Sequence, residues 1–116
     1  MIETVVFNYL IDQDIERIGT NVFMEVPEKP PKAYIVVDKT GSGRENRINR
    51  ATFAIQSISK TSKLEAAEIN EAVKEVMDRF AEESSRIYSC RLDTDYHFSN
   101  PQTKEYRYQA VYNIFY

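Results

Sequence analysis

The residues with the greatest capacity for chemistry lie near the C-terminus, where Asp93, Asp95 and His97 alternate along one segment. If that segment is a strand, alternation places all three side chains on one side, and two carboxylates with an imidazole can hold a divalent cation. A metal normally needs a fourth ligand and supporting groups, and the sequence offers neither nearby. Arg91 and Arg107 are available as ion-pair partners. We therefore predict a solvated, charge-paired face and no metal site.

The single cysteine and the single histidine do not suit a nucleophilic pair. Cys90 and His97 are seven residues apart, so on one strand they would point to opposite sides and lie more than about 20 Å apart. We interpret Cys90 as a small apolar side chain in the core and His97 as solvent-facing. One cysteine cannot form an internal disulfide, which is typical of a reducing compartment.

A cluster of basic residues gives the middle of the chain its own character. Residues 39–63 contain six basic and one acidic residue, whereas 1–38 contain three and seven, and 64–116 contain six and ten, in a chain of net charge −3. The Gly41-Ser42-Gly43-Arg44 segment lacks the lysine and helix of a phosphate-binding loop. Lys39, Arg44, Arg47 and Arg50 instead predict a docking surface for an acidic partner.

Other candidate functions find little support in the residues. The tyrosines of the C-terminal segment resemble a base-stacking surface, but they lack interleaved Lys or Arg, so we assign them to core packing. The carboxylates along 65–83 are spaced as a solvent-facing helix surface. An acidic chain also repels nucleic acid phosphates. We therefore predict no catalytic residues, no cofactor and no sequence-specific nucleic acid binding.

Length and composition indicate a single folded domain over 1–116. The chain is 42% hydrophobic with three glycines and four prolines, and it shows no internal repeat or flexible linker. Its apolar N-terminal stretch from Val5 to Ile11 is interrupted by Asn8 and closed by Asp12 and Asp14, so we expect neither a signal peptide nor a membrane segment.

Hydrophobic spacing predicts the elements of the first half. Phe7, Leu10, Ile11, Ile15 and Ile18 share one helical face, which indicates a helix over Ile2–Ile18 that stops at Gly19. We expect next a short strand over Asn21–Val26, an extended crossing over Pro27–Pro31, and a hairpin whose strands, Ala33–Lys39 and Arg47–Ser59, are joined by a turn over 40–46.

The second half is predicted to be one helix followed by one hairpin. Ser62 and Glu65 form a capping box that begins a helix extending to about residue 83. Alternating strands over 86–98 and 106–116 then surround a turn centred on Pro101, with Asp95 opposite Arg107 and with Tyr96 opposite Tyr106. The fold class is α+β, with the order α-β-β-β-α-β-β and both helices packed on a mostly antiparallel sheet.

Two segments, together with this element order, resemble a known protein family. The segments are Val26-Pro27 through Pro31 with Ala33-Tyr34-Ile35-Val36-Val37-Asp38-Lys39-Thr40-Gly41, and Glu105-Tyr106-Arg107-Tyr108-Gln109-Ala110-Val111-Tyr112. Over almost its full length the chain resembles small tail terminator or head-tail joining proteins of long-tailed bacteriophages.

The resemblance implies a structural protein of the virion that acts at the head-tail interface, after assembly in the host cytoplasm. Such a protein would form a ring of six subunits on the tail tube, complete the tail, and contact the tube protein and head connector proteins, without a cofactor or a membrane. We expect Lys39, Arg44, Arg47 and Arg50 to form its subunit or tube contact. The alternative is a small accessory binding module that binds nucleic acid through the basic 39–50 hairpin.

Overall fold

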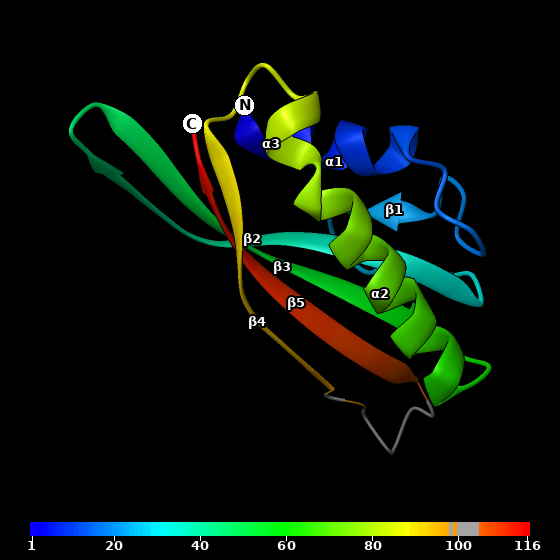
Figure 1. Ribbon diagram of the computed structural model, residues 1–116. Helices are drawn as coiled ribbons and strands as arrows, with labels where there is room; N and C mark the ends of the chain where they lie inside the picture. The colour runs from blue at the N-terminus through cyan, green and yellow to red at the C-terminus, as the bar shows by residue number, and fades with distance from the viewer. Residues whose placement is uncertain (98, 100–104) are drawn as a thin grey trace.

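The computed structural model describes residues 1–97, 99 and 105–116, and these form one five-stranded sheet with helices on one face (Figure 1). In chain order the elements are α1 (Ile2–Asp12), β1 (Val22–Phe23), β2 (Ala33–Glu45), β3 (Ile48–Ser59), α2 (Lys63–Asp78), α3 (Phe80–Glu83), β4 (Ser89–His97) and β5 (Tyr106–Phe115). The strand order is β1-β2-β3-β5-β4, and only the β1–β2 pair is parallel. The predicted α+β class and element order are confirmed, with α3 as one additional helical turn.

The N-terminal helix is shorter than its apolar spacing predicts. The prediction of a helix over Ile2–Ile18 was wrong beyond Asp12, where α1 ends. Asp14 and Arg17 have φ angles of 46° and 78°, and such left-handed residues interrupt helical hydrogen bonding. Gly19 does adopt the expected left-handed conformation, at φ 51°, but it closes a tight turn rather than a helix.

The buried face of α1 also differs from the predicted one. Ile2, Val6 and Leu10 are buried, at the spacing of four that lines one side of a helix. Phe7 and Ile11 are only partly buried and flank this row. The helix therefore packs on the sheet through a face rotated from the one that the sequence pattern indicated.

Strand β1 consists of two residues, whereas we predicted six. Val22 and Phe23 pair with Ile35 and Val36, and the chain then leaves the sheet edge. Met24 and Val26, which lie within the predicted strand, are beyond its observed end and are exposed. The proline segment 27–31 follows as an irregular crossing, in which the carbonyl of Pro30 accepts a hydrogen bond from Lys60 Nζ at 3.2 Å.

The first hairpin is longer than predicted, because its strands continue through the segment assigned to a turn. The ladder runs from Ala33↔Ser59 to Glu45↔Ile48, with one extra residue, Thr40, bulging from β2. The turn is made by Asn46 and Arg47 alone, with φ angles of 51° and 67°. Positive φ at both central residues defines the type I′ turn, which matches the twist of a two-residue hairpin. The predicted turn over 40–46 was therefore wrong.

Helix α2 begins as the capping pattern predicts, with one changed contact. The Ser62 hydroxyl accepts a hydrogen bond from the Glu65 backbone N–H at 3.0 Å. The Glu65 carboxylate does not return to the Ser62 backbone but accepts from the Ser59 hydroxyl at 2.8 Å, and Ser59 Oγ in turn accepts from the Ser62 N–H. The helix ends at Asp78, and α3 completes the predicted helical stretch to Glu83 after a break at Arg79.

Strand β4 contains a bulge that changes which side chains share a face. Its register shifts between Leu92 and Thr94, so that Leu92 pairs with Tyr112 while Asp95 pairs with Ala110. The predicted pairing of Asp95 with Arg107 and of Tyr96 with Tyr106 was wrong by three residues. The predicted turn centred on Pro101 lies outside the described residues.

The core lies between the helices and one face of the sheet. Its largest fully buried members come from the two central strands and the helices, and they include Phe53, Ile55, Ile69, Phe80 and Tyr112. A second, smaller cluster of Tyr34, Val36 and Ile58 packs on the other face, with Phe23 against it. We call the first face of the sheet the helix face and the second the open face.

Candidate assembly interface

The most prominent surface feature is the hairpin end, residues 40–50, which projects from the body of the protein (Figure 1). We call this segment the arm. The molecule measures 44 × 25 × 24 Å, and the arm lies along its long direction. Both strands of the arm remain paired with each other up to the turn. Within the arm, Gly43 and Asn49 are partly buried and the other residues are exposed, whereas Ala51, at its base, is fully buried. The basic segment is thus a formed, solvent-exposed hairpin.

The four basic residues predicted as a contact surface do not act as one patch. Lys39 lies at the base of the arm on the helix face, where its Nζ is 3.3 Å from a Glu3 carboxylate oxygen. A backbone hydrogen bond and then Lys39 lower the pKa of the Glu3 carboxyl, because both favour its charged form. Lys39 therefore helps to hold α1 on the sheet.

The three arginines of the arm point in different directions. Arg44 pairs with Asn49 on the helix-face side, Arg47 lies in the turn, and Arg50 pairs with Gly43 on the open-face side. All three are exposed, and none forms an ion pair with any residue that the structure describes. Their charges are therefore available to a partner on either side of the arm.

Gly43 gives Arg50 room to lie across the arm. A side-chain carbon at Gly43 would be 3.1 Å from the Arg50 guanidinium. The arginine thus covers the backbone of β2, and with Ile48, Glu45 and Phe115 it borders a groove on the open-face side. Ile48 is 41% exposed there. Ile48 lies beside the turn, beyond Ala51, the last buried residue at that end of β3.

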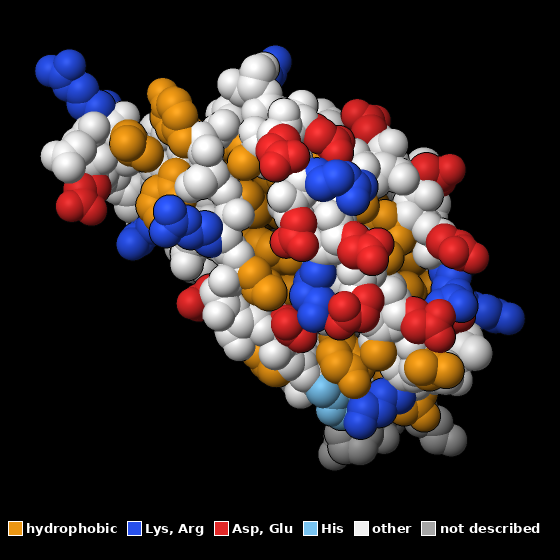
Figure 2. Space-filling view, in the orientation of Figure 1, with side chains coloured by type: hydrophobic (Ala, Val, Ile, Leu, Met, Phe, Trp, Pro, Cys, Tyr) orange, Lys and Arg blue, Asp and Glu red, His pale blue; other side chains and the backbone are white. Residues whose placement is uncertain are grey.

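The opposite charge gathers on the outer face of α2 (Figure 2). Residues 63–83 contain seven acidic and three basic residues. Glu68 forms an ion pair with Arg17, and Glu71 forms one with Lys74 at 2.8 Å. The structure therefore separates the basic arm and the acidic helix surface in space, as the charge distribution along the sequence indicates.

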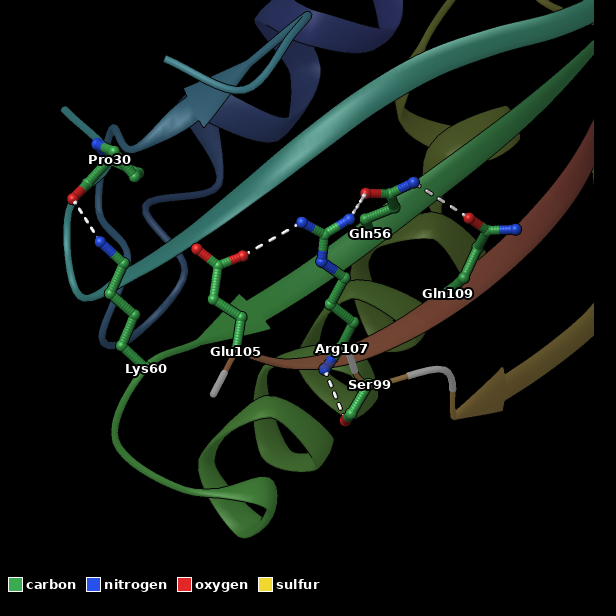
Figure 3. A network of polar contacts seen from close by, with 7 residues as sticks. All are labelled: Pro30, Gln56, Lys60, Ser99, Glu105, Arg107 and Gln109. Atoms are coloured by element: carbon green, nitrogen blue, oxygen red, sulfur yellow. Dashed lines mark hydrogen bonds and ion pairs between the residues drawn. The ribbon is translucent and has the colours of Figure 1, made fainter. Parts of the chain in front are cut away.

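The open face carries a polar network at the end of the sheet away from the arm (Figure 3). Arg107 donates to Glu105 at 3.0 Å and to Gln56 at 3.4 Å, and its backbone N–H donates to Ser99 Oγ. Gln56 and Gln109 join their side-chain amides across β3 and β5 at 3.2 Å. These contacts link neighbouring strands, and amide groups of this kind supply neither a nucleophile nor a titrating base.

The structure separates the three residues considered for a metal. Asp93 lies at the bulge and is exposed, whereas Asp95 turns to the helix face and accepts from Lys74 Nζ at 3.2 Å. His97 is a neighbour of Tyr108, with ring centroids 5.2 Å apart. In the described part of the chain, no three metal-ligating side chains converge.

Cys90 packs against the core as predicted, but the prediction that Cys90 and His97 point to opposite sides was wrong. Because of the bulge, Cys90 and His97 both belong to the helix face, although they remain at opposite ends of β4. Burial raises the pKa of the Cys90 thiol to about 12, with Asp78 adding to the shift, so the thiol is protonated near neutral pH.

Some of the tyrosine side chains are buried in the core, and others are exposed to solvent. Tyr34 and Tyr112 are fully buried, and Tyr9 packs against Phe80 with ring centroids 4.4 Å apart. Tyr88 and Tyr96 are exposed, against the prediction that they lie with Cys90 on the packed face. In the C-terminal segment the assignment to core packing is confirmed for Tyr112 and was wrong for Tyr88 and Tyr96.

Among the described residues, no helix is long and apolar enough to cross a membrane. The candidate site consists of two charged surfaces of opposite sign, the arm and the outer face of α2 (Figure 2).

Comparisons with known proteins identify a matching family and a similar solved structure. The family described as "Tail completion protein gp17" matches residues 13–116. A solved structure titled "Virion of native gene transfer agent (GTA) particle" contains a chain that superposes with a TM-score of 0.66 at 16% identity, covering 90% of each chain. At that identity the likeness shows the fold. A comparison with curated protein sequences finds no match.

The family match covers nearly the whole chain, including the arm, the acidic helix and both hairpins. The chain belongs to the tail completion protein gp17 family of bacteriophage structural proteins.

Proposed function

We propose that this protein forms a ring of six copies at the end of the tail tube, completes the tail and mediates its joining to the head. The family is one of phage tail completion proteins. The similar fold in a gene transfer agent virion supports a place in an assembled particle. The protein would be made and assembled in the host cytoplasm and reside at the head-tail interface. We assign it no catalytic step, cofactor or metal.

The observation that carries the proposal is the exposed basic arm. Its three arginines have no ion pair in the described chain, and it extends beyond the helix-covered sheet. Like charges on a projecting hairpin repel one another and do not stabilise the monomer. A partner with an acidic surface attracts them, so the complex is stabilised. The tail tube protein, head connector proteins and further copies of this chain are the partners that the ring requires.

Reversal of the arm's charge tests this function directly. The triple variant R44E/R47E/R50E should keep the wild-type circular dichroism spectrum and melting temperature, since these side chains lie outside the core. It should fail to restore head-tail joining in extracts depleted of the protein, as counted by electron microscopy of finished particles. K29E, which reverses an exposed lysine away from the arm, serves as the control. Normal particle yield with the triple variant contradicts the proposal.

The same variant separates this function from nucleic acid binding through the basic 39–50 hairpin. Binding to phosphate releases counterions, so it should appear with isolated DNA and weaken steeply as salt rises. We expect no measurable binding of the wild-type chain to isolated duplex DNA at 150 mM salt. Binding that R44E/R47E/R50E abolishes would establish the accessory-module alternative.

A further inference from the structure

The outer surface of α2 forms a stripe with a composition of its own. Leu64, Glu68, Glu71 and Glu75 follow one another at spacings of four, three and four residues, which places them on one side of the helix. They border a shallow groove together with Ala67. Leu64 is apolar and yet 68% exposed, among charged residues of the helix surface. We call this surface the acidic stripe.

Nothing in the described chain covers the acidic stripe. The opposite side of α2 carries the buried row that includes Ala66, Ile69 and Val73. Glu75 forms no ion pair with any described residue, and the partner of Glu68, Arg17, is itself exposed. Glu71 is paired with Lys74 of the same helix at 2.8 Å. The stripe is therefore an exposed helix face with an apolar residue at one end and carboxylates along its length, of which Glu75 has no ion pair among the described residues.

The arm carries the complementary chemistry. It presents Arg44, Arg47 and Arg50 together with the exposed apolar Ile48. The stripe from Leu64 to Glu75 extends over eleven helical residues, or about 16 Å. The strand from Arg44 to the turn extends about 10 Å, so the end of the arm fits within the stripe.

The arm cannot reach the acidic stripe of its own chain. It leaves the sheet at the end opposite to the first turn of α2 and points away from the body (Figure 1). A contact between the two surfaces therefore joins two molecules. Each molecule offers both an arm and a stripe, so the contact is head to tail, and repetition of it closes a ring if the rotation between copies permits.

The backbone supplies an independent argument for the arm's tip. Arg47 has φ 67° in a turn whose second central position favours glycine. A non-glycine residue in this conformation costs about 1 kcal/mol. The tip thus bears an arginine at a position where it weakens the hairpin, which is understandable if the side chain acts outside the monomer.

We propose that the arm of one copy lies in the acidic stripe of a second copy, with Ile48 on the apolar part of the groove. Arg50, on the same side of the arm as Ile48, and Arg47, in the turn, then lie beside Glu68, Glu71 and Glu75. The inference rests on the proposed ring and names the surfaces that join its subunits. The surface area that one arm buries in one stripe is smaller than that of a standard protein–protein interface. The contact is therefore weak between two copies and becomes stronger when a ring closes.

Two charge-reversed variants test the contact. One is R44E/R47E/R50E, and the other is E68K/E71K/E75K. Either variant alone opposes like charges at every contact and should lose self-association at least about tenfold relative to wild type at low salt. An equimolar mixture allows alternating copies in which every arm meets a stripe of opposite sign, so it should associate within about threefold of wild type. Sedimentation velocity measures each sample.

A gentler pair guards against misfolding, since Glu68 and Glu71 have ion pairs within the chain. R47E and E75K each reverse one exposed side chain without an ion pair in the described structure. Their mixture should likewise associate more strongly than either alone. R47E mixed with R50E is the matched control: both reverse the arm and leave the stripe acidic, so the mixture should associate no more strongly than either variant alone.

Position is tested by cross-linking in a Cys90→Ala background. The variant I48C/L64C should give a ladder of covalent oligomers with a short bis-maleimide. The control M24C/L64C, which has an equally exposed first position, should give none. Equal ladders from both variants contradict the contact.

The outcomes separate this inference from the proposed function. If E68K/E71K/E75K completes tails normally while R44E/R47E/R50E does not, the arm binds another tail protein, and the stripe contact is wrong while the function stands. If mixing restores association but extracts without the chain still complete tails, the contact stands and the function is wrong. A wild-type chain that remains monomeric at about 1 mM and low salt also overturns the contact.

Discussion

Lys74 Nζ lies 3.2 Å from Asp95 Oδ2, and this pair joins helix α2 to the edge strand β4. Lys74 also contacts Glu71 at 2.8 Å, and the hydrogen bond to Glu71, followed by that to Asp95, raises the pKa of the lysine. The bulge before Thr94 is what turns Asp95 to the helix side. One irregularity in a strand thus converts a candidate metal ligand into an anchor for the helix.

Replacement of Lys74 should loosen this anchor. Lys74→Met keeps the apolar stem but removes the charge, and we expect a loss of about 0.5 kcal/mol in the free energy of unfolding, because the pair is partly exposed. Urea denaturation measures the change, which should shrink in 1 M salt. Lys29→Met, an exposed lysine in the loop before β2, is the control. An equal loss in both variants would show that the pair contributes nothing.

Removal of two different tyrosine hydroxyls should have different effects on the stability of the protein. Tyr9 donates to the Val76 carbonyl at 2.6 Å, so Tyr9→Phe should cost about 1 kcal/mol of stability. The buried Tyr112 hydroxyl has no hydrogen-bond partner in the described structure, so Tyr112→Phe should be neutral or stabilising. Thermal denaturation of both variants makes the comparison. A greater loss from Tyr112→Phe than from Tyr9→Phe would contradict these assignments.

The cap of α2 provides a third test. Ser62→Ala removes the acceptor for the Glu65 N–H and should lower the free energy of unfolding by about 1 kcal/mol. Ser42→Ala makes the same chemical change on the exposed arm and should alter stability little. Chemical denaturation distinguishes the two, and a similar effect of both substitutions would argue against the cap.

The reactivity of Cys90 should depend steeply on pH. Because burial raises the pKa of its thiol to about 12, alkylation of the native protein should be slow at pH 8 and accelerate about tenfold per pH unit up to pH 11. In urea the rate should level off above the ordinary thiol pKa of about 8.5. The raised pKa means that this group stabilises the fold below about pH 8.5, and that its contribution is lost as the pH rises toward 12. Fast native labelling at pH 8 would contradict the burial.

The turn of the arm should gain stability and lose function when Arg47 becomes glycine. Arg47→Gly relieves the positive φ and should increase the free energy of unfolding by about 0.5 to 1 kcal/mol, while weakening self-association. Arg86→Gly, an exposed arginine without a positive φ, should not stabilise the protein. Denaturation and sedimentation report the two effects, and unchanged association after Arg47→Gly would remove the tip from the contact.

The sequence predicted those elements in which local signals and tertiary packing agree. Helix α2 is such a case, because its cap and its apolar spacing specify the same start and the same buried face. The alternation of β5 likewise places Ala110, Tyr112 and Ile114 in the core. The chain order of all five strands and of both main helices therefore follows from the sequence.

The errors arose where one residue alters the phase of a pattern. The bulge after Leu92 shifts the register without a glycine or proline beside it, and at Thr40 the neighbouring Gly41 was assigned to a turn. Ile15 and Ile18 keep helical spacing, but they are buried by a turn rather than by a helix, and spacing alone cannot distinguish these cases. Strand β1 ends after Phe23 although its partner β2 continues to Glu45.

The sequence predicted the charge of the candidate site but not the contacts of its residues. The charge of residues 39–50 is plain, but Lys39 proved to be bound to Glu3, a contact between segments that only the fold brings together. The exposed position of Ile48 depended on its place beyond the last core pair of β3, and therefore on the length of the hairpin.

The unbroken ladder of the arm, which continues to Glu45 and Ile48, means that this segment is already folded before it meets a partner. Association then requires no conformational search within the arm, and it loses little backbone entropy on contact. Its heat capacity change should reflect only the small apolar area around Ile48. Preorganisation of this kind lets a contact of modest area form quickly and reversibly, so that misplaced subunits can dissociate before the structure closes.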